Sequence, residues 1–183
     1  MRGPGQFGNF DDRFCDELKT WVDGRRVLET FAGNGLLAAG LASRGVDIVS
    51  TSLFSGHDCH NLGMHHDVVE MDAVEAVDRY GDGRDILLMC WPTTVEATTL
   101  AALNWGRKPI VFIGEVTDYS LGMRGLGGCA TDLFFDVTEE TEVFSTYQPR
   151  NMLERAAVRT LRSDAKAIVA KAIANRPAFG FLL

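Results

Sequence analysis

The sequence predicts an α/β protein whose core is a doubly wound, mostly parallel sheet of six to seven strands with helices on both faces. Several short runs are continuously apolar instead of alternating, which is typical of strands that are covered on both faces. Helix-forming stretches separate these runs and supply the crossovers that parallel strands need. The length of 183 residues suits one compact domain, so we expect a single domain over residues 1–183.

The N-terminal elements are expected in the order helix, strand, loop, helix. Residues 1–9 are rich in glycine and are expected to form a flexible lead-in. Asp11 or Asp12 can cap a helix that stops near Gly24. A strand is then expected at 26–31, a glycine-rich loop at 33–35 and a helix at 36–43.

The remaining strands and crossover helices follow the same alternation. Strands are expected at 47–52, 68–71, 85–91, 109–114, 142–147 and 179–183, and helices at 73–80 and 95–103.

The C-terminal segment carries an uneven share of positive charge. Residues 150–176 are predicted to form a basic amphipathic helix, because apolar side chains recur there near helical spacing. Its basic stripe consists of Arg155, Arg159, Arg162 and Lys166. We interpret the stripe as the solvated side of a core-packing helix, while docking onto a second subunit of a homodimer, or onto RNA or DNA, stays open. The net charge of −7 disfavours nucleic acid for the molecule as a whole.

The strongest functional signal is the run Val-Leu-Glu-Thr-Phe-Ala-Gly-Asn-Gly at 27–35. Glycines at a strand-to-helix turn let the backbone approach a ligand, and the start of the helix offers free N–H donors. Gly33, Gly35 and Ala38 also satisfy the dinucleotide pattern G-x-G-x-x-G/A. The second strand, however, ends in Ser50-Thr51-Ser52 and lacks the acid that the NAD fingerprint requires there. The loop therefore predicts a nucleotide-like ligand, and the end of the second strand disfavours NAD as that ligand.

An acid four residues before the first glycine, Glu29, makes this run resemble motif I of the Rossmann-fold (class I) S-adenosylmethionine (SAM) dependent methyltransferases. The resemblance covers roughly residues 25–150 and implies SAM as the cofactor, with Glu29 orienting its ammonium directly or through water. Asp72 is similar to the family acid that binds the adenine amino group, and Ala73 beside it offers a backbone N–H. The implied cofactor-binding residues are Glu29, Phe31, Ala32, Gly33, Asn34, Gly35, Thr51, Ser52, Asp72, Ala73 and Cys90.

The acceptor site is expected near the ends of the fourth and fifth strands. Cys90-Trp91-Pro92-Thr93 stands where the family has its strand-four motif, but it lacks the amide or carboxylate of enzymes that methylate exocyclic amines. Trp91 could stack on a planar substrate or pack in the core. Glu115 could act as a general base, orient substrate or be an ordinary loop acid. We expect Trp91 and Glu115 to shape this site, and the sequence does not identify the methyl acceptor.

Metal and membrane functions find little support in the sequence. The loop after the second strand contains His57, His60, His65 and His66, but their spacing matches no zinc pattern, so no metal is expected. The four cysteines follow no paired spacing and are expected to be reduced thiols. We expect a cytoplasmic protein without a membrane partner, because no stretch approaches roughly 18 apolar residues and the N-terminus lacks a secretory signal.

Two alternatives to an active methyltransferase stay open. A catalytically silent Rossmann-fold protein that serves as a binding or assembly module would explain the irregular motifs at strands two and four. An NAD-dependent oxidoreductase would use the same glycine loop.

Overall fold

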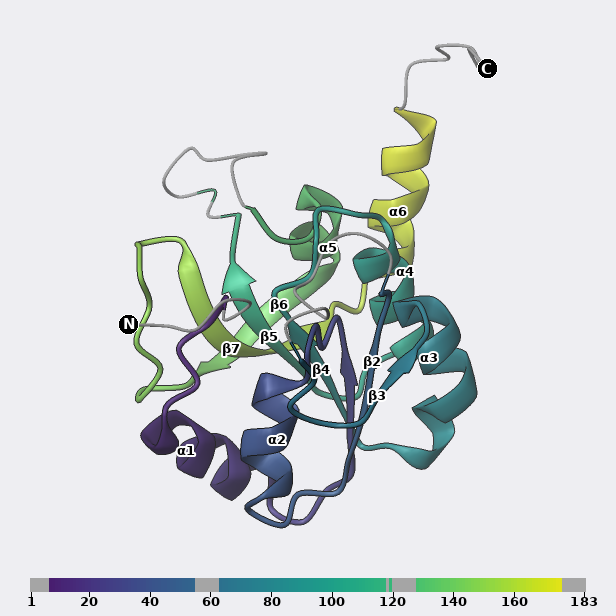
Figure 1. Ribbon diagram of the computed structural model, residues 1–183. Coiled ribbons are helices and arrows are strands. Elements are labelled where there is room, and N and C mark those ends of the chain that lie inside the picture. Colours follow the sequence, from purple (N-terminus) through teal and green to yellow (C-terminus); the bar gives the residue numbers. More distant parts are fainter. Residues whose placement is uncertain (1–6, 55–62, 118, 120–127, 176–183) are drawn as a thin grey trace.

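The computed structural model describes residues 7–54, 63–117, 119 and 128–175 of the chain. These residues contain a seven-stranded sheet in the order β3-β2-β1-β4-β5-β7-β6 (Figure 1). The strands are β1 (Val27–Thr30), β2 (Ile48–Ser52), β3 (Val68–Glu70), β4 (Ile86–Cys90), β5 (Ile110–Glu115), β6 (Thr138–Val143) and β7 (Glu154–Leu161). The first five strands are parallel, and β7 runs antiparallel to both β5 and β6. The predicted mostly parallel α/β sheet is confirmed.

The helices begin where the sequence provides caps. Asp11 accepts a hydrogen bond from the N–H of Phe14 at 3.0 Å and so starts α1. Asp72 caps α3 in the same way, through the N–H groups of the first turn. The helices are α1 (Asp12–Val22), α2 (Leu36–Ala42), α3 (Ala73–Tyr80), α4 (Ala97–Trp105), α5 (Asp132–Val137) and α6 (Ala165–Ala174), with a 3₁₀ turn at Gly81–Gly83.

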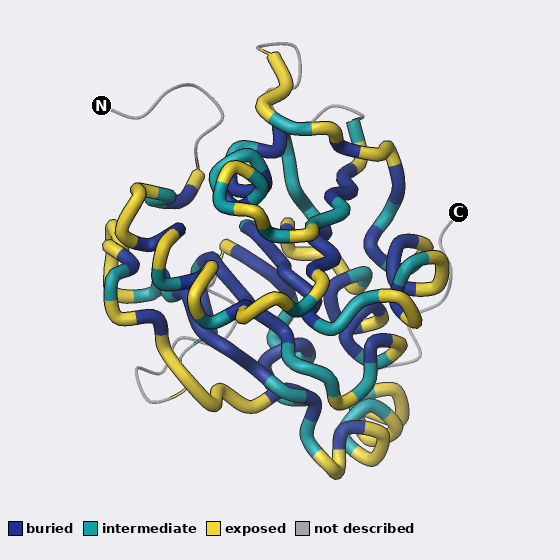
Figure 2. The backbone as a smooth tube through the Cα atoms, turned by 90° about the horizontal axis from the view of Figure 1, so that it is seen from below, coloured by how far each residue is buried: buried dark blue, intermediate teal, exposed yellow. Residues whose placement is uncertain are grey.

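The helices cover the two faces of the sheet, and the central strands β1, β4 and β5 are the most buried part of the chain (Figure 2). Neighbouring residues of a strand point to opposite faces. Val27 of β1 packs with side chains of α1 and α2, whereas Leu28 packs with side chains of α3, α4 and α5. The same alternation places Glu29 on the face of α2 and Thr30 on the face of α3.

The predicted basic helix over 150–176 is wrong in its first part, because Glu154–Leu161 forms β7 and the helix begins only at Ala165. A step of four residues is consistent with one face of a helix and equally with one face of a strand. The spacing of Arg155 and Arg159 therefore does not distinguish a helix from a strand. Arg159 is buried and donates to the Thr138 hydroxyl at 2.9 Å, and burial lowers its pKa to about 10. The four basic residues of the predicted stripe therefore do not lie along one helix.

Smaller differences concern the ends of the sheet. The sixth strand was expected at 142–147 but is Thr138–Val143, and the short helix α5 was not expected. The expected strand at 179–183 lies outside the described residues, as do residues 1–6 of the predicted flexible lead-in. Phe7–Asn9 are described, and Gly8 is buried. Within the described residues, no helix is both long and apolar enough to cross a membrane.

Candidate functional site

The centre of the sheet holds the point at which the strand order reverses. β1 and β4 are neighbours, and the chain leaves β1 for α2 on one face and β4 for α4 on the other. Open α/β sheets bind ligands in the crevice at the carboxyl ends of the strands at such a switch point. The glycine loop after β1 and the segment that begins at Trp91 meet there.

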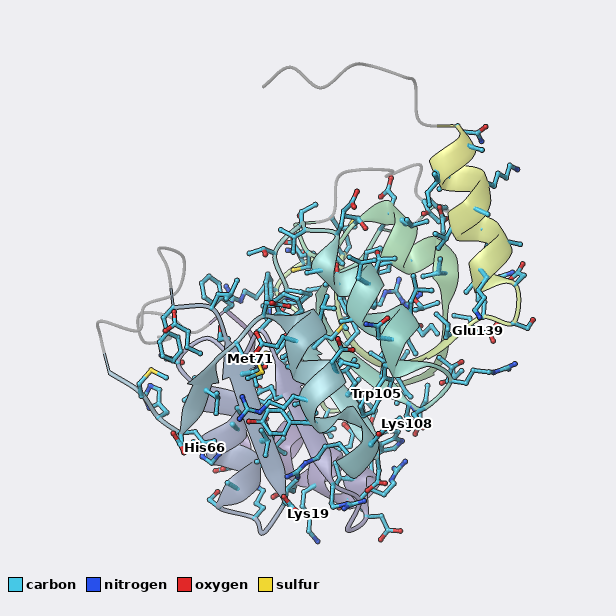
Figure 3. The ribbon with its side chains drawn as sticks, turned by 90° about the vertical axis from the view of Figure 1, so that its right-hand side faces the viewer. Lys19, His66, Met71, Trp105, Lys108 and Glu139 are labelled. Carbon is cyan, nitrogen blue, oxygen red and sulfur yellow. The ribbon has the colours of Figure 1, made fainter. Side chains whose placement is uncertain are left out.

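The larger of two cavities at this edge lies on the side of α3 and has a volume of about 420 Å³, within the range of small-molecule sites. It brings together the ends of β1, β2, β3 and β4. Met71 follows β3, whereas His66 precedes that strand at its other end (Figure 3). The lining residues are Phe31, Ser52, Leu53, Met71, Asp72, Ala73, Trp91, Thr93, Thr94, Val95 and Ala97.

Two predicted cofactor residues in this lining also support the local backbone. The Ser52 hydroxyl accepts a hydrogen bond from the N–H of Gly33 at 3.3 Å. Asp72 accepts from the N–H groups of Val74 and Glu75, at 2.8 and 3.1 Å, and both bonds use Oδ1. Asp72 is thus a helix cap and a cavity residue at once, so its two interpretations do not compete.

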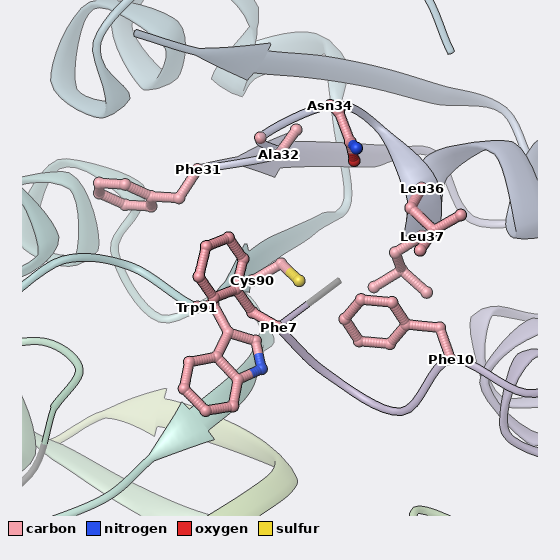
Figure 4. Close-up of a pocket in the computed structure, with 10 residues that line it drawn as sticks. Phe7, Phe10, Phe31, Ala32, Asn34, Leu36, Leu37, Cys90 and Trp91 are labelled. Carbon is pink, nitrogen blue, oxygen red and sulfur yellow. The ribbon is translucent and has the colours of Figure 1, made fainter. Parts of the chain in front are cut away.

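The smaller cavity lies directly over the glycine loop and has a volume of only about 30 Å³ (Figure 4). That volume is less than a tenth of the volume of the larger cavity. Phe7 and Phe10 come from the segment before α1 and form part of its lining. The other lining residues are Phe31, Ala32, Gly33, Asn34, Leu36, Leu37, Cys90 and Trp91.

Several backbone N–H groups of the glycine loop donate hydrogen bonds to carbonyl groups of the protein itself. The N–H of Ala32 donates to the carbonyl of Thr51 at 3.0 Å, and the N–H of Gly35 donates to the carbonyl of Ala32 at 2.9 Å. Thr51 is fully buried and lines neither cavity. Its contribution is therefore to hold the loop against β2.

Two aromatic residues in an unusual backbone conformation separate the cavities. Phe31 follows β1 with φ 61° and Trp91 follows β4 with φ 49°, a region that residues other than glycine rarely occupy. Both side chains line both cavities. Residues held in such conformations cost about 1–3 kcal/mol each and concentrate at binding sites.

Buried polar atoms without a partner gather at the same edge. Among the described residues, these atoms are Oε1 of Glu29, Oγ1 of Thr30 and Nε1 of Trp91. Glu29 is fully buried, and the Ser50 hydroxyl donates to its Oε2 at 2.8 Å. Burial raises the pKa of Glu29 to about 8, although the hydrogen bond from Ser50 opposes the rise. Glu29 lies on the face of the smaller cavity and Thr30 on that of the larger, although neither lines a cavity.

Glu115 lies apart from both cavity linings. Its Oε2 accepts from the N–H of Gly128 at 3.0 Å, and its Oε1 accepts from Nδ2 of Asn151 at 2.9 Å. These contacts join the segments that follow β5 and precede β7.

We expect Glu115→Ala to lower the free energy of unfolding by about 1–3 kcal/mol, because it leaves the Gly128 N–H and the Asn151 amide without their charged acceptor. Affinity for a ligand of the larger cavity should stay within about twofold, which a titration of the same variant measures. A large loss of affinity at unchanged stability would instead place Glu115 in the binding site.

The histidine cluster is only partly described. His65 donates its N–H to the Asn34 carbonyl at 2.8 Å, and His66 lies beside Gly35. His57 and His60 lie outside the described residues. The described part of the chain contains no group of three side chains that could hold a metal ion.

Sequence reasoning missed several lining residues, chiefly Phe7 and Phe10. They precede the first helix in a glycine-rich segment, where no periodicity assigns a partner. Two aromatic residues three positions apart, next to an Asp cap, were the available signal.

No family model matches the sequence, and a search of curated proteins finds no match. Several solved structures share the fold at low identity. The magnesium protoporphyrin IX methyltransferase ChlM of Synechocystis PCC 6803, with bound S-adenosylhomocysteine (SAH), is 13% identical with a TM-score of 0.50, over 82% of this chain and 83% of ChlM. The precorrin-6y C5,15-methyltransferase of Geobacter metallireducens GS-15 is 12% identical with a TM-score of 0.51, over 87% and 93%.

The mitomycin 7-O-methyltransferase MmcR is 12% identical with a TM-score of 0.50, over 82% of this chain. The chain spans about half the length of MmcR, 54%, and the same share of the methyltransferase SibL. These likenesses concern the arrangement of the backbone. The chain therefore has the fold of the class I SAM-dependent methyltransferases.

Proposed function

We propose that the protein binds SAM at the carboxyl edge of β1, β2, β3 and β4 and transfers its methyl group to an acceptor. The larger cavity is the observation that carries this proposal. Its volume of about 420 Å³ suits a nucleoside, and its walls offer Ser52, Asp72 and the backbone of Ala73 to polar groups and Phe31 and Trp91 to a flat ring.

The glycine loop and Glu29 support the position of the rest of the cofactor. A ligand that extends from the larger cavity past Phe31 reaches the loop at Gly33, on the face where Oε1 of Glu29 lacks a partner. An ammonium group near this carboxyl would supply the missing interaction. Methyl transfer is an in-line displacement at a sulfonium, so alignment of the acceptor could provide much of the catalysis.

The SAM proposal is tested by calorimetric titration of the full chain with SAM, SAH and NADH. We expect heat with SAM and SAH and none with NADH. Asp72→Ala should weaken SAH binding about tenfold through the loss of one polar contact in the cavity. Asp11→Ala serves as the control, because it removes a comparable helix cap outside both cavities. Equal SAH affinity of the two variants would contradict the proposed position of the nucleoside.

A second candidate, a catalytically silent binding module, is favoured by one observation. The space over the glycine loop is only about 30 Å³, and Phe7 and Phe10 are part of its lining. A protein that never admits the amino-acid end of SAM would keep this arrangement. Heat with neither SAM nor SAH would support this candidate over methyl transfer.

A further inference from the structure

The segment Phe7–Phe10 is seated closely on the candidate cofactor site. The ring centroids of Phe7 and Trp91 lie 6.2 Å apart, and those of Phe10 and Phe14 lie 6.4 Å apart. Gly8 between them is buried, and a Cβ on it would lie 2.3 Å from Cε1 and Cζ of Phe10 and 3.1 Å from Nε1 of Trp91. A side chain at this position would therefore require the Phe10 ring to move.

The two cavities are adjacent and very unequal. They share Phe31 and Trp91 in their linings, but the larger has a volume of about 420 Å³ and the smaller about 30 Å³. A nucleoside fits the first. The amino-acid tail of SAM or SAH has several heavy atoms, whereas the second cavity is less than a tenth as large as the first.

The smaller cavity is lined by apolar side chains on one side and by the polar glycine loop with Asn34 on the other. Phe7, Phe10 and Leu37 present apolar surface there. An ammonium and a carboxylate without polar partners are costly to bury. The unpartnered carboxyl oxygen of Glu29 lies on the same face of the sheet, so a polar partner exists beneath this apolar cover.

We propose that Phe7 and Phe10 determine which class of ligand the site accepts: the larger cavity takes an adenine nucleoside without an amino-acid tail, and SAM or SAH binds fully only after these rings leave the glycine loop. The inference rests on the proposed SAM site and adds a specificity-determining segment to it. The free protein divides between a closed state, with the rings on the glycine loop, and an open state without them. The apparent affinity for a ligand with an amino-acid tail is then the affinity of the open state multiplied by the open fraction.

The test compares two probes that share the nucleoside and differ in the tail, SAH and 5′-methylthioadenosine. Their dissociation constants are measured by calorimetry on the full chain and on Phe7→Ala, Phe10→Ala and Gly8→Ala. The third variant keeps both rings but forces the Phe10 ring from its seat. Leu100→Ala is the control, because this exposed side chain lies on α4 and lines neither cavity.

Each of the three variants should bind SAH about tenfold more tightly than the unchanged protein, since the ring no longer has to be displaced. Their affinity for 5′-methylthioadenosine should change by no more than about twofold, because this probe does not reach the smaller cavity. Leu100→Ala should change neither constant.

The result separates failure of this inference from failure of the proposed function. If both probes bind but the ratio of their affinities is the same in all proteins, the rings do not select the ligand and only the inference falls. If Phe7→Ala and Phe10→Ala weaken SAH binding, the rings belong to the tail site and the inference is again overturned. If neither probe binds any variant, the proposed SAM site is wrong, and the inference falls with it.

Discussion

Glu29→Gln should abolish most of the affinity for SAH while making the empty protein more stable in alkaline solution. The carboxyl is fully buried, its pKa is raised to about 8, and its Oε1 has no partner. An amide has nearly the same shape, can still accept from the Ser50 hydroxyl, and carries no charge. Loss of a charged partner for an ammonium group should lower SAH affinity about 10- to 100-fold, measured by calorimetry at pH 8.

The stability effect follows from the direction of the pKa shift. Because the folded pKa lies above the ordinary value of 4.5, the folded protein holds the proton in a range where the unfolded chain has released it. Stability of the unchanged protein should fall as pH rises from about 4.5 to about 8. Glu29→Gln lacks this loss, so it should be more stable by up to about 4 kcal/mol at pH 9 and nearly equal below pH 4. Urea denaturation at the two pH values measures the difference.

A second buried carboxyl provides the control. Glu154 on β7 is also buried, but it accepts from the Tyr147 hydroxyl and from the N–H of Arg150. Glu154→Gln should therefore lose stability at pH 9 and leave SAH affinity within about twofold. If Glu29→Gln behaves like Glu154→Gln, Glu29 is a structural residue and its proposed contact with the cofactor is wrong.

Ligand binding should couple to the same proton. An ammonium group beside Glu29 favours the carboxylate, so SAH binding below pH 8 should release a proton, and its affinity should rise by up to about tenfold per pH unit toward pH 8. A flat affinity between pH 6 and pH 8 would contradict this coupling.

Parallel strands and the glycine loop could be predicted because local residues determine them. Val27 and Leu28 are buried on opposite faces, so β1 begins with consecutive apolar residues, and Gly35 marks the turn that follows. The C-terminal part could not be predicted in the same way. Arg155 and Arg159 are compatible with a helix or a strand, and only pairing with β5 and β6, distant in sequence, decides for β7.

The candidate site shows the same limit. Asp72 and Ser52 were accessible to sequence reasoning because they end elements that a motif aligns. Phe7 and Phe10 were not, since their position depends on Trp91 and Leu37, which only the folded sheet brings to them. A motif can thus predict which backbone segment lies beside a cavity, but not which distant side chains line the same cavity.

Gly35→Ala should be among the most disruptive single substitutions in the loop. Gly35 has φ +75°, and an added Cβ would lie 2.9 Å from both the Cβ of His66 and Cγ2 of Val68. The left-handed backbone alone costs roughly 1–2 kcal/mol for a residue with a side chain. The contacts add to this cost because Val68 belongs to β3 and cannot move without the strand.

The backbone cost and the contact cost can be measured separately, because the chain contains a matched glycine. Gly24 has φ +74°, and a Cβ there would meet nothing within 4 Å. Gly24→Ala should therefore lose about 1–2 kcal/mol in urea denaturation and Gly35→Ala about 2–4 kcal/mol, and only the second should weaken SAH binding. That difference follows from the position of β3, whose displacement moves Met71, Asp72 and Ala73 in the wall of the larger cavity. Equal losses in the two variants, with SAH affinity unchanged, would mean that β3 yields to the added methyl group and that the glycine loop does not fix the shape of this cavity.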